Sequence, residues 1–367
     1  MRFAPRKILL AAVFLLLPLL TRAARPEEKI IAGAIRWDAW HGDRSEVGKA
    51  VQRSLGPAKW HGRLPFFARI LADDQVRIDG SSQRIMDREI QYARSAGLDY
   101  WAFLLYADGS AMNHGLEHYL SSARGRGLQF CLILEQGQWA DAEAASRQLE
   151  RAAALMADPG YQRVAGGRPL LYLLTADPAS QAWGAHQSSV AMAQLRSLTR
   201  AKHLVEPYVV VLDFSSSRAS RVREELHADA ISAYAFQRDG TNAPYSQLAR
   251  EVERFWEECR STNSAVVPIV MTGWDRRPRV ERPVFWESWQ QPNVGLEKFY
   301  AAPTPPQLSN HLTHAVEWIQ SHPAAAPAKA ILIYAWNEND EGGWLVPTLN
   351  EGRARLRAVH TALRNAH

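Results

Sequence analysis

The stretch Ile331-Leu-Ile-Tyr-Ala-Trp-Asn-Glu-Asn-Asp-Glu-Gly-Gly-Trp344 joins an apolar run to a cluster of aromatic, amide and acidic side chains. The apolar part indicates a strand buried on both faces, because such strands lack polar alternation. Glu338 and Glu341 then follow, between Trp336 and Trp344. Packing gives no reason for this arrangement, whereas carboxylic acids beside indoles suit proton transfer to a sugar oxygen and binding of the sugar ring. The alternative is an acidic turn that faces water.

Outward from this stretch, short apolar runs alternate with longer amphipathic ones. We predict strands at residues 30–37, 100–106, 129–135, 169–175, 207–213, 230–236, 266–272 and 330–336, and helices at 82–95, 115–126, 142–156, 188–202, 217–226, 245–261, 308–321 and 351–365. Eight strands alternating with helices predict an α/β fold, a single (β/α)8 TIM barrel. A doubly wound open sheet is the alternative, but a Gly-rich loop often follows its first strand, and here Trp37-Asp38-Ala39-Trp40 follows.

Residues 24–367 contain no linker rich in Pro, Gly or Ser, so we predict one catalytic barrel domain over this range. The segments 40–81 and 274–306, after strands 1 and 7, are too long for ordinary βα loops. Both follow strands, so these extended loops are expected on the C-terminal face of the barrel, where they would form the walls of a cleft.

The N-terminus carries the pattern of a signal peptide over residues 1–23. Arg2, Arg6 and Lys7 precede an apolar run at 8–20 and a small-residue exit that ends at Ala23. We predict a secreted or periplasmic protein, with an uncleaved segment that anchors it as the alternative, and no other membrane association. This segment holds four cations and no acid, so its removal lowers the net charge from +5 to +1. The basic composition therefore does not indicate a nucleic-acid partner, and we predict none.

Tryptophan and cysteine usage give further expectations. The 13 tryptophans exceed what packing usually requires and favour stacking against sugar rings. Cys131 lies in an apolar run and is predicted to be a buried thiol, although a disulfide with Cys259 stays open. No Cys/His cluster has metal-ligand spacing, so we expect no metal and no cofactor, and a monomer with a glycan as substrate.

Polar and aromatic side chains follow the predicted strands, at the end of a barrel where active sites lie. Beside the catalytic candidates Glu338 and Glu341, the predicted substrate-binding residues are Trp37, Asp38, Tyr106, Glu135, Tyr234, Trp274, Asp275, Trp336, Asn337 and Trp344. An acid such as Glu135 inside a barrel mouth costs free energy unless it is paired or used. Tyr106 and Tyr234 have a second interpretation as core aromatics.

Two further sets of charged residues at the strand ends each have two interpretations. Asp177 and Asp213 either belong to the site or cap the helices that follow them. Arg276, Arg277 and Arg279 either form a solvated loop or pair with the carboxylates of the mouth.

The segment Trp336-Asn-Glu-Asn-Asp-Glu-Gly342 resembles the Trp/Phe-Asn-Glu-Trp-x-Glu-Gly motif of glycoside hydrolase family 99 and the related WbsX-type proteins encoded with bacterial polysaccharide genes. Three further segments are similar to parts of these proteins. Residues 96–103 are similar to their second strand, residues 161–172 to the segment that leads into their fourth strand, and residues 229–234 to their sixth strand. Residues 273–279 match the Gly-Trp-Asp-x-x-Pro-Arg loop after the seventh. The segments follow the same order over nearly the whole chain. Asn339 replaces a Trp of the motif, and Asp340 adds a third acid.

The resemblance implies a (β/α)8 glycosidase that retains configuration on α-linked glycans, with α-mannosides as the best-known substrates. It implies that Glu338 acts as a base that removes the proton of the sugar's 2-hydroxyl, so that this oxygen displaces the leaving group and a 1,2-anhydro sugar forms. It also implies that Glu341 is the general acid in this step and the general base in the next. These roles require Glu341 protonated and Glu338 ionised at rest. Asn337 or an arginine near Glu338 would lower the pKa of Glu338, and burial would raise that of Glu341.

The leading hypothesis is therefore an exported retaining glycoside hydrolase. The alternatives are a non-catalytic glycan-binding barrel and a surface-polysaccharide processing protein of the WbsX type. Export argues against a transferase role for a polysaccharide-processing protein, because the sugar-nucleotide donors of transferases are cytoplasmic.

Overall fold

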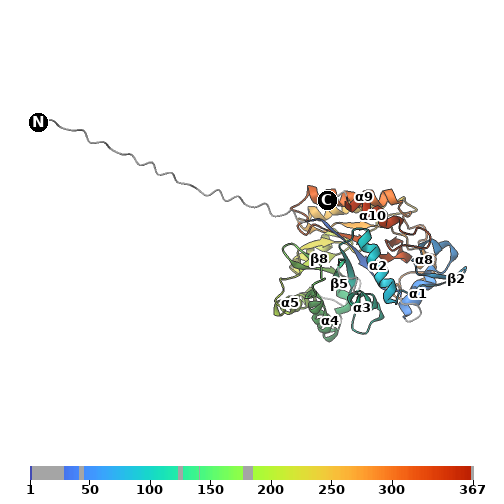
Figure 1. The fold of residues 1–367 in the computed structure, drawn as a ribbon, viewed down its shortest axis with the longest axis horizontal. Helices are drawn as coiled ribbons and strands as arrows, with labels where there is room; N and C mark the ends of the chain where they lie inside the picture. The colour runs from blue at the N-terminus through green and yellow to red at the C-terminus, as the bar shows by residue number, and fades with distance from the viewer. Residues whose placement is uncertain (2–28, 41–44, 123–126, 140, 177–184, 365–367) are drawn as a thin grey trace.

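The computed structural model describes Met1 and residues 29–40, 45–122, 127–139, 141–176 and 185–364. Asp177 and the predicted signal segment beyond Met1 lie outside this range. Figure 1 shows helices arranged around a central sheet. None of the helices in the described ranges is long and apolar enough to cross a membrane.

Parallel strands form the inner ring, and all eight predicted strands are confirmed within the described residues. They are β1 (Ile31–Arg36), β4 (Tyr100–Leu104), β5 (Gln129–Glu135), β7 (Arg168–Leu174), β8 (Tyr208–Leu212), β9 (Ala230–Ser232), the pair β10 (Ala265–Val266) and β11 (Ile269–Met271), and β12 (Ala330–Tyr334). They pair in the order β10-β9-β8-β7-β5-β4-β1-β12-β11, with β6 (Arg163–Val164) antiparallel on β7.

The seventh strand closes the barrel although it is broken in the middle. Its first half, β10, pairs with β9, and its second half, β11, pairs with β12. Pro268 between them has no N–H to donate, which interrupts the ladder. The backbone still bridges both neighbours, because Val267 N donates to Ile231 O at 3.1 Å and Leu332 N donates to Pro268 O at 3.0 Å. Residues 265–271 therefore join the two ends of the sheet.

Amphipathic helices cover the outside of the ring, as their periodicity predicts (Figure 1). They are α2 (Gln83–Ser95), α3 (His114–Ser121), α4 (Ala142–Met156), α5 (Ala185–Ala201), α6 (Ser216–Glu225), α7 (Tyr245–Ser261), α9 (Pro305–Ser321) and α10 (Ala354–Arg364). Local sequence sets several starts: the Asp141 side chain accepts from Ala144 N at the start of α4, and Thr304 and Gln307 form a capping box on α9.

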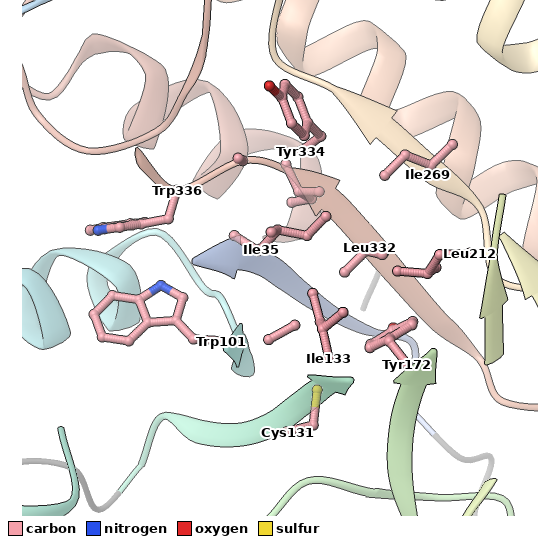
Figure 2. Close-up of a cluster of buried hydrophobic side chains, with 14 of the residues drawn as sticks. Ile35, Trp101, Cys131, Ile133, Tyr172, Leu212, Ile269, Leu332, Tyr334 and Trp336 are labelled. Carbon is pink, nitrogen blue, oxygen red and sulfur yellow. The ribbon is translucent and has the colours of Figure 1, made fainter. Parts of the chain in front are cut away.

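The barrel interior is filled by large apolar side chains. In Figure 2, Ile35, Ile133, Tyr172, Leu212 and Leu332 gather between the strands. The Tyr100 and Tyr172 hydroxyls lie 2.7 Å apart, and Tyr100 donates to Ile331 O at 2.9 Å, so neither buried hydroxyl is unsatisfied. Position 33 is glycine because a Cβ there would overlap the Tyr100 ring.

Both cysteines are free and buried. Burial raises the pKa of the Cys131 and Cys259 thiols. The buried-thiol prediction for Cys131 is confirmed, and the two cysteines do not pair.

Both extended βα loops carry structure of their own and meet at one end of the barrel. The loop after β1 contains α1 (Glu46–Leu55), the 3-10 helix η2 (Ala58–Arg63) and a hairpin of β2 (Arg69–Ala72) and β3 (Gln75–Arg77). The loop after β11 contains α8 (Arg277–Glu281). Lys59 pairs with Glu281 at 2.7 Å, and Trp60 Nε1 donates to the same carboxylate at 3.0 Å. Figure 1 shows α1, α8 and β2 together.

Candidate active site

The chain after β12 folds back on itself and so brings two glutamates to the C-terminal mouth of the barrel. Two short strands, β13 (Asn337–Glu338) and β14 (Gly343–Trp344), pair antiparallel around the 3-10 turn Asn339–Glu341. Gly342 closes the turn at φ +86°, where a Cβ would lie 2.5 Å from Asp275 N. Only glycine fits both the left-handed backbone and the close approach. The Tyr334–Ala335 peptide bond before this turn is cis.

Glu338 is almost fully buried, with 3% of the residue exposed. The Tyr234 hydroxyl donates to its Oε1 at 2.7 Å, and Arg279 Nη2 lies 3.7 Å from its Oε2. Burial, and then the neighbouring charge of Glu341, raise the pKa of Glu338 well above its usual value. Its environment favours the protonated form.

Glu341 lies slightly closer to solvent and contacts more donors. Arg279 Nη1 donates to its Oε1 at 2.5 Å, Arg276 Nε lies 3.3 Å from the same oxygen, and the Tyr334 hydroxyl donates to Oε2 at 2.5 Å. Burial alone would raise the pKa of Glu341, but the charges of Arg279 and Arg276 outweigh it and lower the pKa. Its environment favours the carboxylate.

Both pKa shifts run opposite to the ionisation states expected from the resemblance. We expected Glu338 to be the ionised member, with Asn337 or an arginine beside it. Instead, Asn337 binds the end of β1: its Oδ1 accepts from Trp37 N at 2.9 Å and its Nδ2 donates to Trp37 O at 2.6 Å. The closest arginine contacts go to Glu341 and lower its pKa, whereas burial raises that of Glu338.

Arg279 lies at the centre of the acidic cluster, with 4% of its side chain exposed. Besides Glu341, its Nε donates to Asp340 Oδ2 at 2.6 Å and its Nη1 to Glu287 Oε1 at 3.0 Å. Its guanidinium lies 5.2 Å from the centre of the Trp37 ring. Burial opposes its charge, but Asp340 and Glu341 raise the pKa of Arg279 well above its usual value. Arg279 therefore pairs with carboxylates of the mouth, and the alternative interpretation as part of a solvated loop is wrong for this residue.

Asp275 joins three loops instead of pointing at the glutamates. It accepts from Arg277 Nε and Nη2 at 2.8 and 2.7 Å, and it forms an ion pair with Arg63 from the loop after β1. Its backbone N donates to Glu341 O at 2.7 Å. Burial raises its pKa, but the contacts with Arg277 and Arg63 outweigh that effect and lower it. These bonds fix the position of the turn that carries Glu341.

Four predicted aromatic residues surround the pair. Tyr234 contacts Glu338 directly, and Trp274 packs on Tyr334 with ring centres 5.8 Å apart. Trp37 packs on Arg279 and donates its Nε1 proton to the Tyr106 hydroxyl at 2.9 Å.

The predicted residue Glu135 stands at the end of β5. Gln138 Nε2 donates to its Oε2 at 3.1 Å. Burial, and then the charge of Glu135, raise the pKa of Tyr106, so this acid lies beside Tyr106 at the same mouth.

Three predicted residues, Asp38, Trp336 and Trp344, are engaged elsewhere. Arg36 pairs with Asp38 at 2.9 Å and with Glu89 at 2.8 Å, and Trp336 Nε1 donates to Glu89 at 3.0 Å. The Trp336 ring packs on Trp101 at 4.9 Å, away from Tyr334 (Figure 2). Trp344 packs under the guanidinium of Arg355, 3.6 Å from its ring centre. The structure gives these three residues supporting roles.

Asp213, at the end of β8, has a local role. Its Oδ1 accepts from Ser215 N at 2.8 Å, and its Oδ2 pairs with Arg218 at 2.5 Å and accepts from Thr175 at 2.6 Å. It therefore orders the start of α6.

Sequence reasoning missed Tyr334, Glu287 and Arg63. Tyr334 had a signal, because it is an aromatic residue with a hydroxyl group near the C-terminal end of a predicted barrel strand, where active sites lie. Glu287 and Arg63 lie in long loops with no periodicity, so no pattern assigns them partners.

Comparison with known proteins supports the fold. No protein-family model matches the chain, and no curated protein is similar to it in sequence. A GH99 endo-α-mannosidase from Bacteroides thetaiotaomicron is similar in structure, with 14% identity over 91% of this chain and a TM-score of 0.59 in complex with bis-tris-propane and 0.57 in a second structure. These matches cover 97% and 98% of that chain. A glycoside hydrolase-like protein matches at 10% identity over 92% of this chain and 94% of its own, with a TM-score of 0.58.

At such low identity these likenesses show the fold alone. The resemblance inferred from the motifs is confirmed at that level: the chain has the (β/α)8 fold of the GH99 endo-α-mannosidase.

Proposed function

We propose that this protein is a glycoside hydrolase in which Glu338 and Glu341 carry out proton transfer. The observation that carries the proposal is geometric: the two acids lie at one barrel mouth and share Arg279, which is 3.7 Å from Glu338 and 2.5 Å from Glu341. One pKa is raised by burial and the other is lowered by arginines. Two carboxyl groups whose environments push their pKa values apart are what acid–base catalysis on a glycosidic bond requires.

We propose an α-linked glycan, with α-mannosides first, as substrate, on the strength of the motif resemblance and the fold shared with an endo-α-mannosidase. In the first step Glu338 takes the proton of the 2-hydroxyl, O2 attacks C1, and the bond from C1 to the leaving oxygen breaks while Glu341 protonates that oxygen. In the second step water attacks C1 and gives a proton to Glu341, the bond between C1 and O2 breaks, and Glu338 returns its proton to O2. The configuration at C1 is retained.

This sequence needs the proton on Glu341, whereas the unliganded arrangement holds it on Glu338. A sugar that enters between Glu341 and the guanidinium groups of Arg276 and Arg279 would separate these charges. Without the nearby cations, burial raises the pKa of Glu341, and the proton moves from Glu338 to Glu341. Substrate binding thereby sets the roles of both acids.

Kinetics on a panel of α-linked oligosaccharides, α-mannosides included, test this function. Wild type should hydrolyse at least one substrate, and Glu338→Gln and Glu341→Gln should each lose about 10²–10⁴-fold in kcat/KM. Glu46→Gln is a matched control, because Glu46 is exposed on the surface of α1, where it forms an ion pair with Lys49 at 2.8 Å. An inert wild type, or active glutamine variants, would overturn the proposal. Sugar binding without turnover by all four proteins would favour the glycan-binding barrel.

Export as a monomer is also a proposal, and it rests on the sequence of residues 1–23. Sequencing of the secreted or periplasmic protein should begin at Ala24, and size-exclusion chromatography with light scattering should give one chain. A membrane-bound protein that keeps residues 1–23 would instead support the anchor.

A further inference from the structure

A pocket of about 590 Å³ opens between the β2–β3 hairpin and the first turns of α2. Four arginines line it: Arg69 and Arg77 from the hairpin and Arg84 and Arg88 from α2. Asp79 is the one acid among the lining residues, so the lining carries a formal charge of +3. A concave surface with one sign of charge concentrates positive potential inside it.

The positive charge of this pocket is poorly neutralised. Arg77 lies 3.5 Å from Asp79, a long and exposed contact, and Arg88 donates to the neutral Tyr92 hydroxyl at 2.9 Å. In the described part of the chain, Arg69 and Arg84 are exposed and have no acidic partner. The arginines of the catalytic cluster differ, because Arg279 and its neighbours are paired with carboxylates.

Aromatic rings lie beside these guanidinium groups. Phe66 and Phe67 line the pocket and pack edge to face, with ring centres 5.1 Å apart. Arg88 lies over the Phe66 ring at 5.5 Å. An aromatic face suits the apolar face of a sugar, and an arginine fork suits a carboxylate or sulfate.

A short piece of chain connects this pocket to the candidate active site. Phe66 N donates to Pro347 O at 2.8 Å, just beyond the turn that carries Glu341. Three residues before Phe66, Arg63 pairs with Asp275, and its carbonyl oxygen accepts from Asn339 Nδ2 at 2.5 Å. The loop after β1 therefore links the lining of the pocket to the turn that carries Glu341.

We propose that this pocket binds an anionic substituent of a glycan, a carboxylate or sulfate, and that the substrate of this protein is an acidic polysaccharide. The identity of that glycan as a substrate rests on the proposed hydrolase function, whereas anion binding by the pocket does not. Arg84 and Arg88 hold the anion, and Phe66 packs against the ring that carries it.

Calorimetric binding of dextran sulfate and of neutral dextran tests the pocket, because the two polymers share one α-glucan backbone. Wild type should bind dextran sulfate more tightly than dextran, and added salt should weaken that binding. The double variant Arg84→Gln/Arg88→Gln should bind about tenfold more weakly, since two charge-assisted contacts are lost. Arg250→Gln/Arg254→Gln is the matched control: two exposed arginines, also four residues apart, on α7.

Equal losses in both double variants, or no loss in either, would overturn the proposal. Vesicles of phosphatidylglycerol and of phosphatidylcholine provide the second arm. If Arg84 and Arg88 govern binding to the anionic vesicles but not to dextran sulfate, the pocket recognises a membrane surface and the glycan proposal fails. No arm reads hydrolysis, so a protein that binds dextran sulfate here but cleaves no glycan contradicts the proposed function alone.

Discussion

Replacing Arg279 with glutamine removes the cation shared by the carboxylates of the barrel mouth. Asp340 and Glu341 lose contacts of 2.6 and 2.5 Å in a site where Asp340 is 1% exposed. Breaking a buried ion pair by removing one partner costs about 3–5 kcal/mol, because the other charge stays buried and unpaired. At pH 7 we expect the free energy of unfolding to fall by an amount in this range. The loss should not exceed it, because Arg276 still lies 3.3 Å from Glu341 and offsets part of its charge.

The loss should depend on pH with a definite sign. In the wild type, the arginines hold the pKa of Glu341 below its usual value despite burial. That stabilisation is present above the unfolded-state pKa, about 4.3, and is lost as pH falls through the lower folded-state pKa. In Arg279→Gln, one of the two cations that lower the pKa of Glu341 is missing, so burial raises this pKa. At acid pH Glu341 is then protonated, and the variant no longer bears the cost of a buried unpaired carboxylate. The difference in unfolding free energy should therefore shrink from pH 7 to pH 4.5.

Urea unfolding at the two pH values measures this difference for wild type, Arg279→Gln and Arg279→Lys. Arg200→Gln serves as control, because Arg200 and its partner Glu206 are 58% and 46% exposed and such surface pairs contribute about 1 kcal/mol or less. Lysine should restore part of the stability. A cost below about 1 kcal/mol at pH 7, or one that is the same at both pH values, would refute the electrostatic account of this site.

Three further outcomes follow from the contacts of single residues. Gly342→Ala should lower the free energy of unfolding by about 2–3 kcal/mol. The control Gly166→Ala should lower it by about 1 kcal/mol, because Gly166 also has a positive φ but no atom lies within 4 Å of its added Cβ. Equal shifts in melting temperature would contradict the close approach of Gly342 to Asp275. Glu89→Ala should cost about 3–5 kcal/mol in urea unfolding, since it leaves the buried Arg36 without one partner, and a cost like that of a surface pair would argue against the network. Burial raises the pKa of Glu338, so wild-type stability should fall as pH rises above about 4.3; Glu338→Gln should lack this fall between pH 5 and 8, and parallel pH curves would count against a protonated Glu338.

Local patterns predicted the barrel because each element is specified by nearby residues. The apolar runs and the caps at Asp141 and Thr304 fix strands and helix starts without reference to the rest of the chain. The seventh strand shows the limit of this reasoning. Residues 266–272 read as one strand, but Pro268 divides it, and pairing decides that its halves serve different neighbours.

The sequence predicted where the catalytic candidates lie, but not which side chains contact them. Glu338 and Glu341 stand at the barrel mouth as expected, yet their ionisation depends on which guanidinium groups lie within a few ångström. That distance is set by the fold of a long loop, where Arg279 turns toward Glu341. Trp336 was expected beside the sugar because it adjoins the acids in sequence, but the backbone turns its indole toward Glu89.

The roles of Glu338 and Glu341 are tested most directly by proton NMR of an α-mannan oligosaccharide during hydrolysis. With wild type, the α anomer of the new reducing end should appear first and the β anomer only by later mutarotation. With Glu341→Gln, the same signal should grow about 10²–10⁴-fold more slowly. A β anomer that appears first, or an equal rate in Glu341→Gln, would contradict the retaining hydrolase, and no new anomeric signal from wild type would contradict α-mannan as its substrate.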